Sequence, residues 1–284
     1  MKKSKVVSVT AVVVLSLVAL VAAYLLIASI MNRPAEAPES TSKTVVQYEP
    51  NRLDDAGVST RLLELHEENE DVVALISIEG TTLEYPVMSS TPEDYYFRRG
   101  VDKKYNTSGL PFLANDCELN APGGNMIIYG HNMERETNLE PVFAALSKYR
   151  TLDFTQENPI ITFDTLDGRH EYVVISVVLT DVANDGFYYW DMKDVSGKAN
   201  DEFLYAVRRR SIVNTTLPAG PDDAYMTLST CAQDGGANGR LVILARELRE
   251  GEKDATLGMK YTHNERVVLP RIFEGKIEFE PVKE

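Results

Sequence analysis

The sequence predicts a mainly β domain, a barrel or a sandwich, in which a few short helices join many short strands. Runs of β-branched and aromatic residues recur along the chain and are separated by turn signals such as Glu79-Gly80 and Asp167-Gly168. Residues 225–231 and 241–245 are two such runs, divided by a Gly-rich loop. Helical spacing of apolar residues is found in a few short stretches only.

The same signals predict each element in order. A helix is expected to end near Glu68, with Ser59 or Thr60 as its N-cap. A second is expected over 140–148, with Pro141 in its first turn, and a third over 200–213. Pro86 is expected near a sheet edge because it lacks an N–H group. Strands are expected over 72–78, 83–88, 109–114, 125–129, 160–163, 171–180, 225–231 and 240–245, and a hairpin over 272–277.

The N-terminus has the pattern of a membrane anchor. Lysines in residues 1–5 precede an uncharged run over 6–31, which exceeds the ~20 apolar residues needed to span a bilayer. By the positive-inside rule, residues 1–5 form a cytoplasmic tip and the bulk lies outside the cell. A cleavable signal is the alternative, because Ala35-Glu-Ala37 resembles a cleavage site, but Pro38 disfavours it.

Beyond the anchor, the sequence divides into a stalk, a domain and a tail. Residues 32–50 are rich in Pro, Ser and Glu and are expected to form a flexible stalk. The domain is expected over 51–249 and a charged C-terminal extension over 250–284. All 43 acidic residues follow position 32, so the outer part is strongly acidic and repels nucleic acid. We expect no nucleic-acid partner.

The candidate site combines three strand ends. The run 225–231 ends at Cys231, and Arg240 opens the next strand, so neighbouring strands would hold a thiol and a guanidinium at one end of a sheet. Upstream, the run 125–129 leads into Gly130-His131, where a glycine lets the backbone turn and present the imidazole. Alone, such a histidine is typical of a side chain satisfied by backbone groups. Beside a strand-end Cys and Arg it indicates catalysis.

These residue types suit acyl transfer. A thiolate attacks a carbonyl, an imidazolium donates a proton to the departing amine, and a fixed guanidinium stabilises the developing oxyanion by roughly 3–4 kcal/mol. No carboxylate stands beside the histidine, so a papain-like triad is not indicated. Histidines and cysteines are too scattered for zinc and no acidic calcium loop is evident, so we expect neither a metal nor a cofactor.

The second cysteine leaves two interpretations open. Cys117 and Cys231 could be joined in a disulfide, as is common outside the cell. Alternatively, Cys231 is a reactive thiol, because it ends a strand beside a Gly-rich loop and an arginine.

The segments Thr227-Leu-Ser-Thr-Cys231, Tyr129-Gly-His131-Asn-Met and Gly239-Arg240-Leu-Val-Ile resemble the sortases, cysteine transpeptidases of the Gram-positive cell surface. The helix over 200–213 and the segment 71–87 are similar to class B. The resemblance implies a closed eight-stranded barrel with an N-terminal helix and a helix in the loop before the catalytic strand.

It also implies a reaction. Cys231 would cleave a C-terminal sorting signal after Thr, and an amine of a cell-wall precursor of the lipid II type or of a pilin would resolve the thioacyl enzyme. His131 would act first as general acid and then as base, and Arg240 would hold the substrate and the oxyanion. The resemblance places four residues along the groove: Tyr129, Ser229, Thr230 and Arg98.

Two departures from class B concern specificity. An acidic residue often follows the cysteine in class B, whereas this chain has Ala232, with Asp234 further on. Arg98 stands where class B members commonly have Asn. The extension over 250–284 is longer than the family suggests and is expected to cover the groove.

Two other functions compete with the transpeptidase. One is an extracellular cysteine hydrolase of peptidoglycan peptides, which would release product without an amine acceptor. The other is an anchored β-barrel that only binds a partner and whose two cysteines are bridged, so that its native form has no free thiol.

Overall fold

The computed structural model describes residues 52–133, 141–184, 187–253, 256 and 258–277. All of them belong to one compact unit, Pro50–Glu284. The tip, anchor and stalk expected over 1–50 lie outside the described residues, as do the last seven positions. Within the described ranges, no helix is both long enough and apolar enough to cross a bilayer.

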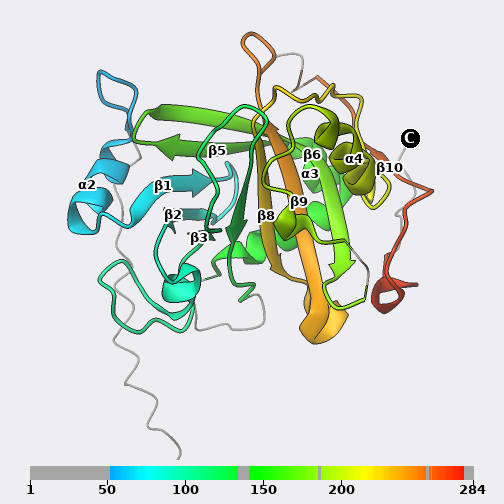
Figure 1. The fold of residues 1–284 in the computed structure, drawn as a ribbon, viewed down its shortest axis with the longest axis horizontal. Helices are drawn as coiled ribbons and strands as arrows, with labels where there is room; N and C mark the ends of the chain where they lie inside the picture. Colours follow the sequence, from blue (N-terminus) through cyan, green and yellow to red (C-terminus); the bar gives the residue numbers. More distant parts are fainter. Residues whose placement is uncertain (1–51, 134–140, 185–186, 254–255, 257, 278–284) are drawn as a thin grey trace, which may run out of the picture. The chain divides into compact units, whose positions relative to one another are not determined.

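Eight strands close into a barrel in the order β1-β2-β3-β4-β8-β9-β6-β5 (Figure 1). The prediction of a mainly β protein with a closed eight-stranded barrel is therefore confirmed. Two further strands, β7 (Val213–Asn214) and β10 (Thr262–His263), pair with each other outside it. The barrel strands are β1 (Val72–Ser77), β2 (Glu84–Met88), β3 (Phe112–Leu113), β4 (Asn125–Tyr129), β5 (Ile160–Thr165), β6 (Gly168–Asp181), β8 (Tyr225–Cys231) and β9 (Gly239–Glu247).

Helices stand at the positions that the resemblance implied. Helix α2 (Thr60–Glu68) precedes β1, and its N-cap is Ser59, whose hydroxyl accepts a hydrogen bond from the Leu62 amide at 3.0 Å. Helix α4 (Lys198–Arg208) lies in the connection before β8. The remaining helices are α3 (Leu152–Glu157) and the 3₁₀ helices η1 (Glu93–Arg98), η2 (Phe143–Arg150), η3 (Tyr189–Asp191), η4 (Gln233–Asn238) and η5 (Arg271–Phe273).

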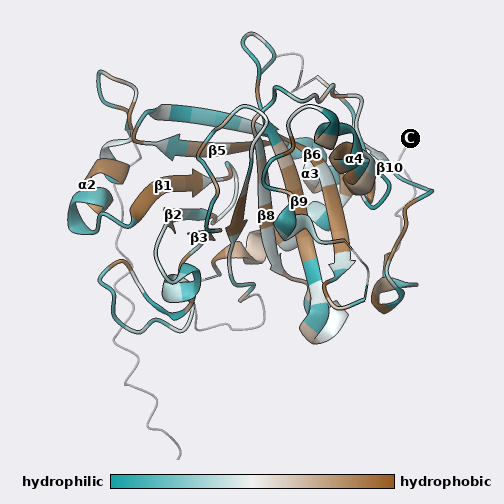
Figure 2. Cartoon of the chain, viewed as in Figure 1, coloured by the Kyte–Doolittle hydropathy of each residue, from teal (hydrophilic) through white to brown (hydrophobic). Residues whose placement is uncertain are grey.

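Strand alternation gives the barrel wall two apolar faces. On β8, Met226 and Leu228 belong to the main core cluster, whereas Tyr225 belongs to a second cluster with Phe203 and Leu204 of α4. Figure 2 shows the hydrophobic residues along β1 and along the middle of β9. Each fully buried large side chain stabilises the fold by about 1.5–3 kcal/mol. The second cluster holds the α4 region against the wall that carries Cys231.

Two helix predictions are wrong in their limits. The helix expected over 140–148 is the 3₁₀ helix η2, which begins at Phe143 because Val142 still pairs with Asn132 in a β-bridge. Residue 140 lies outside the described residues. The helix expected over 200–213 ends at Arg208 instead. Beyond it, the Ile212 amide donates to the Val177 carbonyl at 2.8 Å, so pairing with a strand replaces the last helical turn.

The predictions for residues 109–114 and 272–277 change as well, whereas that for Pro86 does not. The strand expected over 109–114 contracts to the two residues of β3. Pro86 pairs with Leu75 of β1, and the contact between β2 and β3 is a single register pair at Met88, so the proline lies outside it. The hairpin expected over 272–277 is wrong: η5 ends at Phe273, which is fully buried, and residues 274–277 form a turn without a strand.

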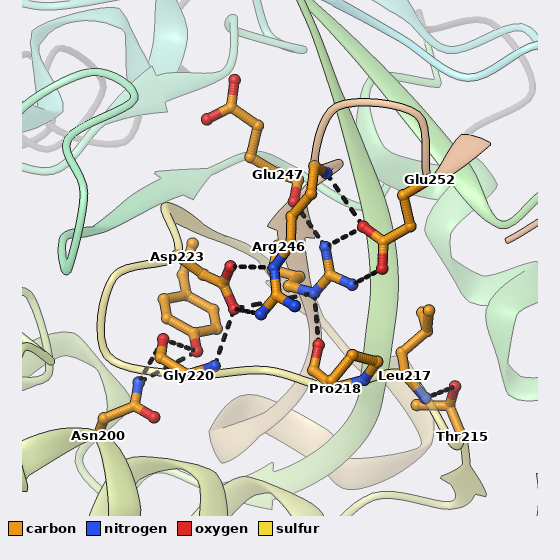
Figure 3. A network of polar contacts seen from close by, with 11 residues as sticks. Asn200, Thr215, Leu217, Pro218, Gly220, Asp223, Arg246, Glu247 and Glu252 are labelled. Atoms are coloured by element: carbon orange, nitrogen blue, oxygen red, sulfur yellow. Dashed lines mark hydrogen bonds and ion pairs between the residues drawn. The ribbon is translucent and has the colours of Figure 1, made fainter. Parts of the chain in front are cut away.

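A buried arginine ties the end of β9 to the chain that follows (Figure 3). Arg246 is 0% exposed and donates to both carboxylate oxygens of Glu252, at 2.8 and 2.5 Å. It also donates to the carbonyls of Pro218 and Glu247, each at 2.8 Å. The hydrogen bonds from the Arg246 guanidinium to the carboxylate lower the pKa of Glu252 below its usual value. The ion pair therefore stays charged at neutral pH and fixes the start of the C-terminal extension.

We predict that Glu252→Ala lowers the free energy of unfolding by about 3 kcal/mol, because it leaves a buried guanidinium without its main partner. The matched control is Lys253→Ala, which removes an ion pair with Glu171 at the surface and is expected to cost at most about 1 kcal/mol. Urea denaturation measures both. Equal losses for the two variants would contradict the account of Arg246.

A candidate cysteine active site at one end of the barrel

The thiol and the guanidinium predicted from strand ends belong to directly opposed residues of two neighbouring strands. Strands β8 and β9 are antiparallel, and Cys231 is the register partner of Arg240. Directly opposed residues point to the same face, with Cα atoms about 4.5–5.5 Å apart. The loop between them closes through a hydrogen bond from the Ala232 amide to the Gly239 carbonyl at 3.0 Å. The two side chains therefore occupy neighbouring positions where the strand pair ends.

The same loop fixes the direction of the guanidinium. Arg240 Nη1 donates to the carbonyl of Ala237 at 3.0 Å and to that of Gly239 at 2.9 Å. Among the described residues, none accepts a hydrogen bond from Nε or Nη2. A guanidinium held on one side by backbone carbonyls keeps its other N–H groups for a ligand.

Both cysteines are free thiols. The interpretation of Cys117 and Cys231 as a disulfide is wrong, and with it the bridged binding module. Cys231 is exposed, whereas Cys117 is half-buried and its burial raises the pKa of its thiol. Since the thiolate is the nucleophile, Cys117 is the poorer candidate of the two.

The imidazole reaches the same end of the barrel through β4. This strand runs parallel to β8 with Tyr129 opposite Ser229, and the next residue, Gly130, donates to the Ser229 carbonyl at 3.1 Å. His131 follows. Beyond it, the Asn132 side-chain amide donates to the Cys231 carbonyl at 3.0 Å. The pairing thus brings His131 level with the end of β8.

Gly130 is required for a different reason from the one expected. A Cβ atom there would stand 2.5 Å from the Phe143 ring, so the glycine permits close approach of an aromatic side chain rather than a left-handed turn. The Phe143 amide in turn donates to the His131 carbonyl at 2.9 Å. The backbone of His131 is therefore fixed from both sides.

The imidazole of His131 lies against Phe97. Its Nε2 is 3.0 Å from the Phe97 carbonyl oxygen, and the two ring centroids are 4.0 Å apart. Burial lowers the pKa of His131 below its ordinary value, the Phe97 carbonyl raises it, and the charge of Arg98 lowers it further. The imidazole is thus mainly neutral at pH 7. The hydrogen-bond partner of the ring is thus a backbone carbonyl.

Four other residues were expected along the groove. Tyr129 is half-buried with its ring 5.5 Å from Phe112, and Arg98 is exposed over the Phe97 ring. The charge of Arg98 acts on His131, and Tyr129 is the last residue of β4, two positions before the histidine.

Ser229 and Thr230, by contrast, are buried. The Ser229 hydroxyl lies 2.6 Å from the Tyr189 hydroxyl, and Thr230 donates to the Gly130 carbonyl at 2.7 Å. Thr230 therefore joins β8 to β4. Contact between substrate and any of the four residues stays a prediction.

Three residues of the site were missed from the sequence. Phe97 packs on His131, Asn132 holds the Cys231 carbonyl, and Tyr189 contacts Ser229. Burial raises the pKa of Tyr189 while the Arg240 guanidinium pulls it down, which places this ring within electrostatic reach of Arg240. Available signals were the position of Asn132 directly after the histidine and the aromatic run over 187–190.

An exposed thiol, a neutral imidazole and an oriented guanidinium at one end of a closed barrel form the arrangement of a cysteine-dependent acyl-transfer enzyme. Comparison with known proteins agrees. The sequence model of the Sortase domain matches residues 76–248. The protein belongs to the sortase family of cysteine transpeptidases, and within it to class B.

The individual relatives are class B enzymes. The chain is 28% identical to sortase B of Staphylococcus aureus over 182 residues, 64% of this chain and 72% of that protein. It is 28% identical to sortase B of Listeria monocytogenes over 187 residues, 66% of this chain and 73% of that protein. A structure of the Staphylococcus aureus sortase B–substrate complex has a TM-score of 0.59 at 26% identity, covering 68% of this chain and 87% of that one.

The lowered pKa of His131 predicts a pH effect on stability. The unfolded chain takes up a proton near the ordinary histidine pKa of about 6.5, whereas the folded imidazole resists it, so stability falls as the pH drops through this range. We expect the wild type to lose more unfolding free energy between pH 7.5 and 5.5 than His131→Gln, which cannot titrate. Urea denaturation at both pH values measures this. Identical losses would contradict the burial effect on His131.

The two thiols are predicted to react at different rates. Under non-reducing conditions, a thiol-specific chromogenic reagent should titrate Cys231 at least about tenfold faster than Cys117, because only Cys231 is exposed. Cys231→Ala should remove the fast phase and Cys117→Ala the slow one. A native chain without free thiols would contradict this assignment.

Proposed function

We propose that the protein is a membrane-anchored transpeptidase that cleaves a C-terminal sorting signal of secreted proteins after Thr. The cleaved protein is joined to an amine, either of a cell-wall precursor of the lipid II type or of a pilin. The observation that carries this proposal is the register pair of exposed Cys231 and oriented Arg240 beside His131, in a class B sortase barrel. The substrate complex of the Staphylococcus aureus relative supports a sorting-signal substrate.

In the first step, the Cys231 sulfur attacks the carbonyl carbon of Thr. The thiol proton passes to the neutral imidazole of His131, and the resulting imidazolium gives it to the departing amine as the C–N bond breaks. The carbonyl oxygen, on which negative charge develops, accepts hydrogen bonds from Arg240. The products of this step are a thioester on Cys231 and a free amine.

In the second step, the acceptor amine attacks the thioester carbon. His131 takes a proton from the attacking nitrogen and returns it to the departing Cys231 sulfur, so enzyme and imidazole end as they began. The lowered pKa of His131 supports this cycle, because both steps begin with neutral imidazole.

The proposed location is the surface of a Gram-positive cell. Residues 6–31 serve as a single-pass anchor with a cytoplasmic N-terminus, and residues 32–50 as the stalk that holds the domain outside. The support for this part of the proposal is the charge and hydropathy pattern of the sequence together with the family.

We predict cleavage of quenched fluorescent peptides with Asn-Pro-x-Thr or Pro-Pro-x-Thr-Gly segments by the full chain in detergent. Cys231→Ala should abolish cleavage, His131→Ala should reduce it about 10²–10⁴-fold, and Arg240→Ala about 10²–10³-fold. Cys117→Ala is the matched control and should keep the wild-type rate. Fluorescence gives the rates, and chromatography with added amine identifies the products.

Cleavage that persists in Cys231→Ala would contradict the proposal. Cleavage of peptidoglycan peptides but of no sorting peptide, with hydrolysed product only, would instead favour the cysteine hydrolase.

A further inference from the structure

Part of the chain beyond the family match returns to the barrel. The Sortase domain match ends at residue 248, and residues 258–277, here named the C-terminal strap, run past α4 toward the tip that joins β8 to β9 (Figure 1). The Tyr261 hydroxyl donates to the Val174 carbonyl at 2.6 Å, and the Val268 amide donates to the Arg209 carbonyl at 2.9 Å. Strand β10 of the strap pairs with β7. The strap is thus anchored along its length.

The end of the strap packs on the loop between Cys231 and Arg240. Phe273 is fully buried, and its ring lies over Gly235: a Cβ atom there would stand 2.4 Å from Cζ of the ring. Only a glycine permits this contact. Lys276 Nζ adds a hydrogen bond to the Asp234 carbonyl at 2.6 Å. The aromatic ring therefore bears directly on the loop backbone.

This loop sets the position of the guanidinium. The Gly235 amide donates to the Ala232 carbonyl at 2.9 Å, and two residues further along, the Ala237 carbonyl accepts from Arg240 Nη1 at 3.0 Å. A continuous chain of contacts thus runs from Phe273 through the loop backbone to Arg240. Because Gly236 has a φ of +68° and no side chain packs there, the loop depends on its neighbours for a defined shape.

An ion pair also holds the same loop. Asp234 forms a bidentate ion pair with Arg150 of η2, at 3.1 and 2.9 Å. Asp234, three positions after Cys231, thus holds the loop to η2. Arg150 of η2 binds the carboxylate of Asp234, and Lys276 of the strap binds its backbone carbonyl. Both η2 and the strap therefore hold the same loop residue.

We propose that Phe273 is a positioning residue for acyl transfer: through Gly235 it holds the loop that orients Arg240 opposite Cys231. This inference rests on the roles proposed above for those two residues. That the C-terminal extension covers the groove stays a prediction, and the contacts described above place the strap on the loop. The function of the strap is to reduce the number of conformations open to the loop, and a displacement of the guanidinium by 1 Å is enough to cost up to about 10²-fold in rate.

The test compares Phe273→Leu, and Phe273→Ala as the larger deletion, with Tyr261→Leu in the full chain. Tyr261 is the matched control because it is an equally buried aromatic residue of the strap, and its partner Val174 pairs with Ala245, five strand positions beyond Arg240. Quenched-peptide kinetics give kcat and KM, and amide hydrogen exchange reports on residues 232–239. Thermal unfolding confirms that each variant is folded.

We expect Phe273→Leu to lower kcat about tenfold with little change in KM and to speed exchange in the loop. Tyr261→Leu should leave both near wild type. In an Arg240→Ala background, Phe273→Leu should cause no further loss of kcat, because it acts through the arginine.

Unchanged loop exchange in Phe273→Leu would overturn the proposal. So would equal kcat losses in Phe273→Leu and Tyr261→Leu, or a full additional loss in the Arg240→Ala background, since either result indicates general destabilisation. A wild-type enzyme that transfers no peptide would instead defeat the proposed function. The exchange comparison would then decide by itself whether Phe273 holds the loop.

Discussion

The site depends on the pairing of β8 with β9. This antiparallel ladder makes Cys231 and Arg240 register partners, and a shift by one residue would turn one of them to the opposite face. Both strands are buried along most of their length, so the register is set by the core. The reactive pair is thus a product of barrel packing, and the short loop between the strands adds the orientation of the guanidinium.

A second strand pairing, the parallel one between β4 and β8, positions the imidazole. Strand β4 lies beside β8, and Thr230 bonds to the Gly130 carbonyl, so His131 follows the position of β8 closely. Chain segments that are remote in sequence complete the site: Phe97 supports the imidazole, and Tyr189 lies under Ser229. The barrel positions the thiol, the imidazole and the guanidinium, whereas the surrounding loops set their electrostatics.

Much of the barrel was predictable, and so were the positions of Cys231, His131 and Arg240 at or next to strand ends, because strand patterns are local signals. Their catalytic roles stay a prediction. What sequence reasoning missed depends on tertiary contacts. Gly130 leaves room for the Phe143 ring, which packs where a Cβ atom would stand. Phe273 is buried against Gly235, a residue 38 positions earlier in the chain. Neither contact produces a periodic pattern in the sequence. The disulfide interpretation failed for the same reason, because spacing does not reveal whether two cysteines meet.

The most direct test of the account is the mass of the enzyme trapped with a sorting peptide in the absence of an acceptor amine. The account predicts an increase equal to the acyl part of the peptide, located by peptide mapping on Cys231, absent in Cys231→Ala and discharged by an added amine. An adduct on Cys117, or cleavage with no adduct in a chain that turns over, would contradict it.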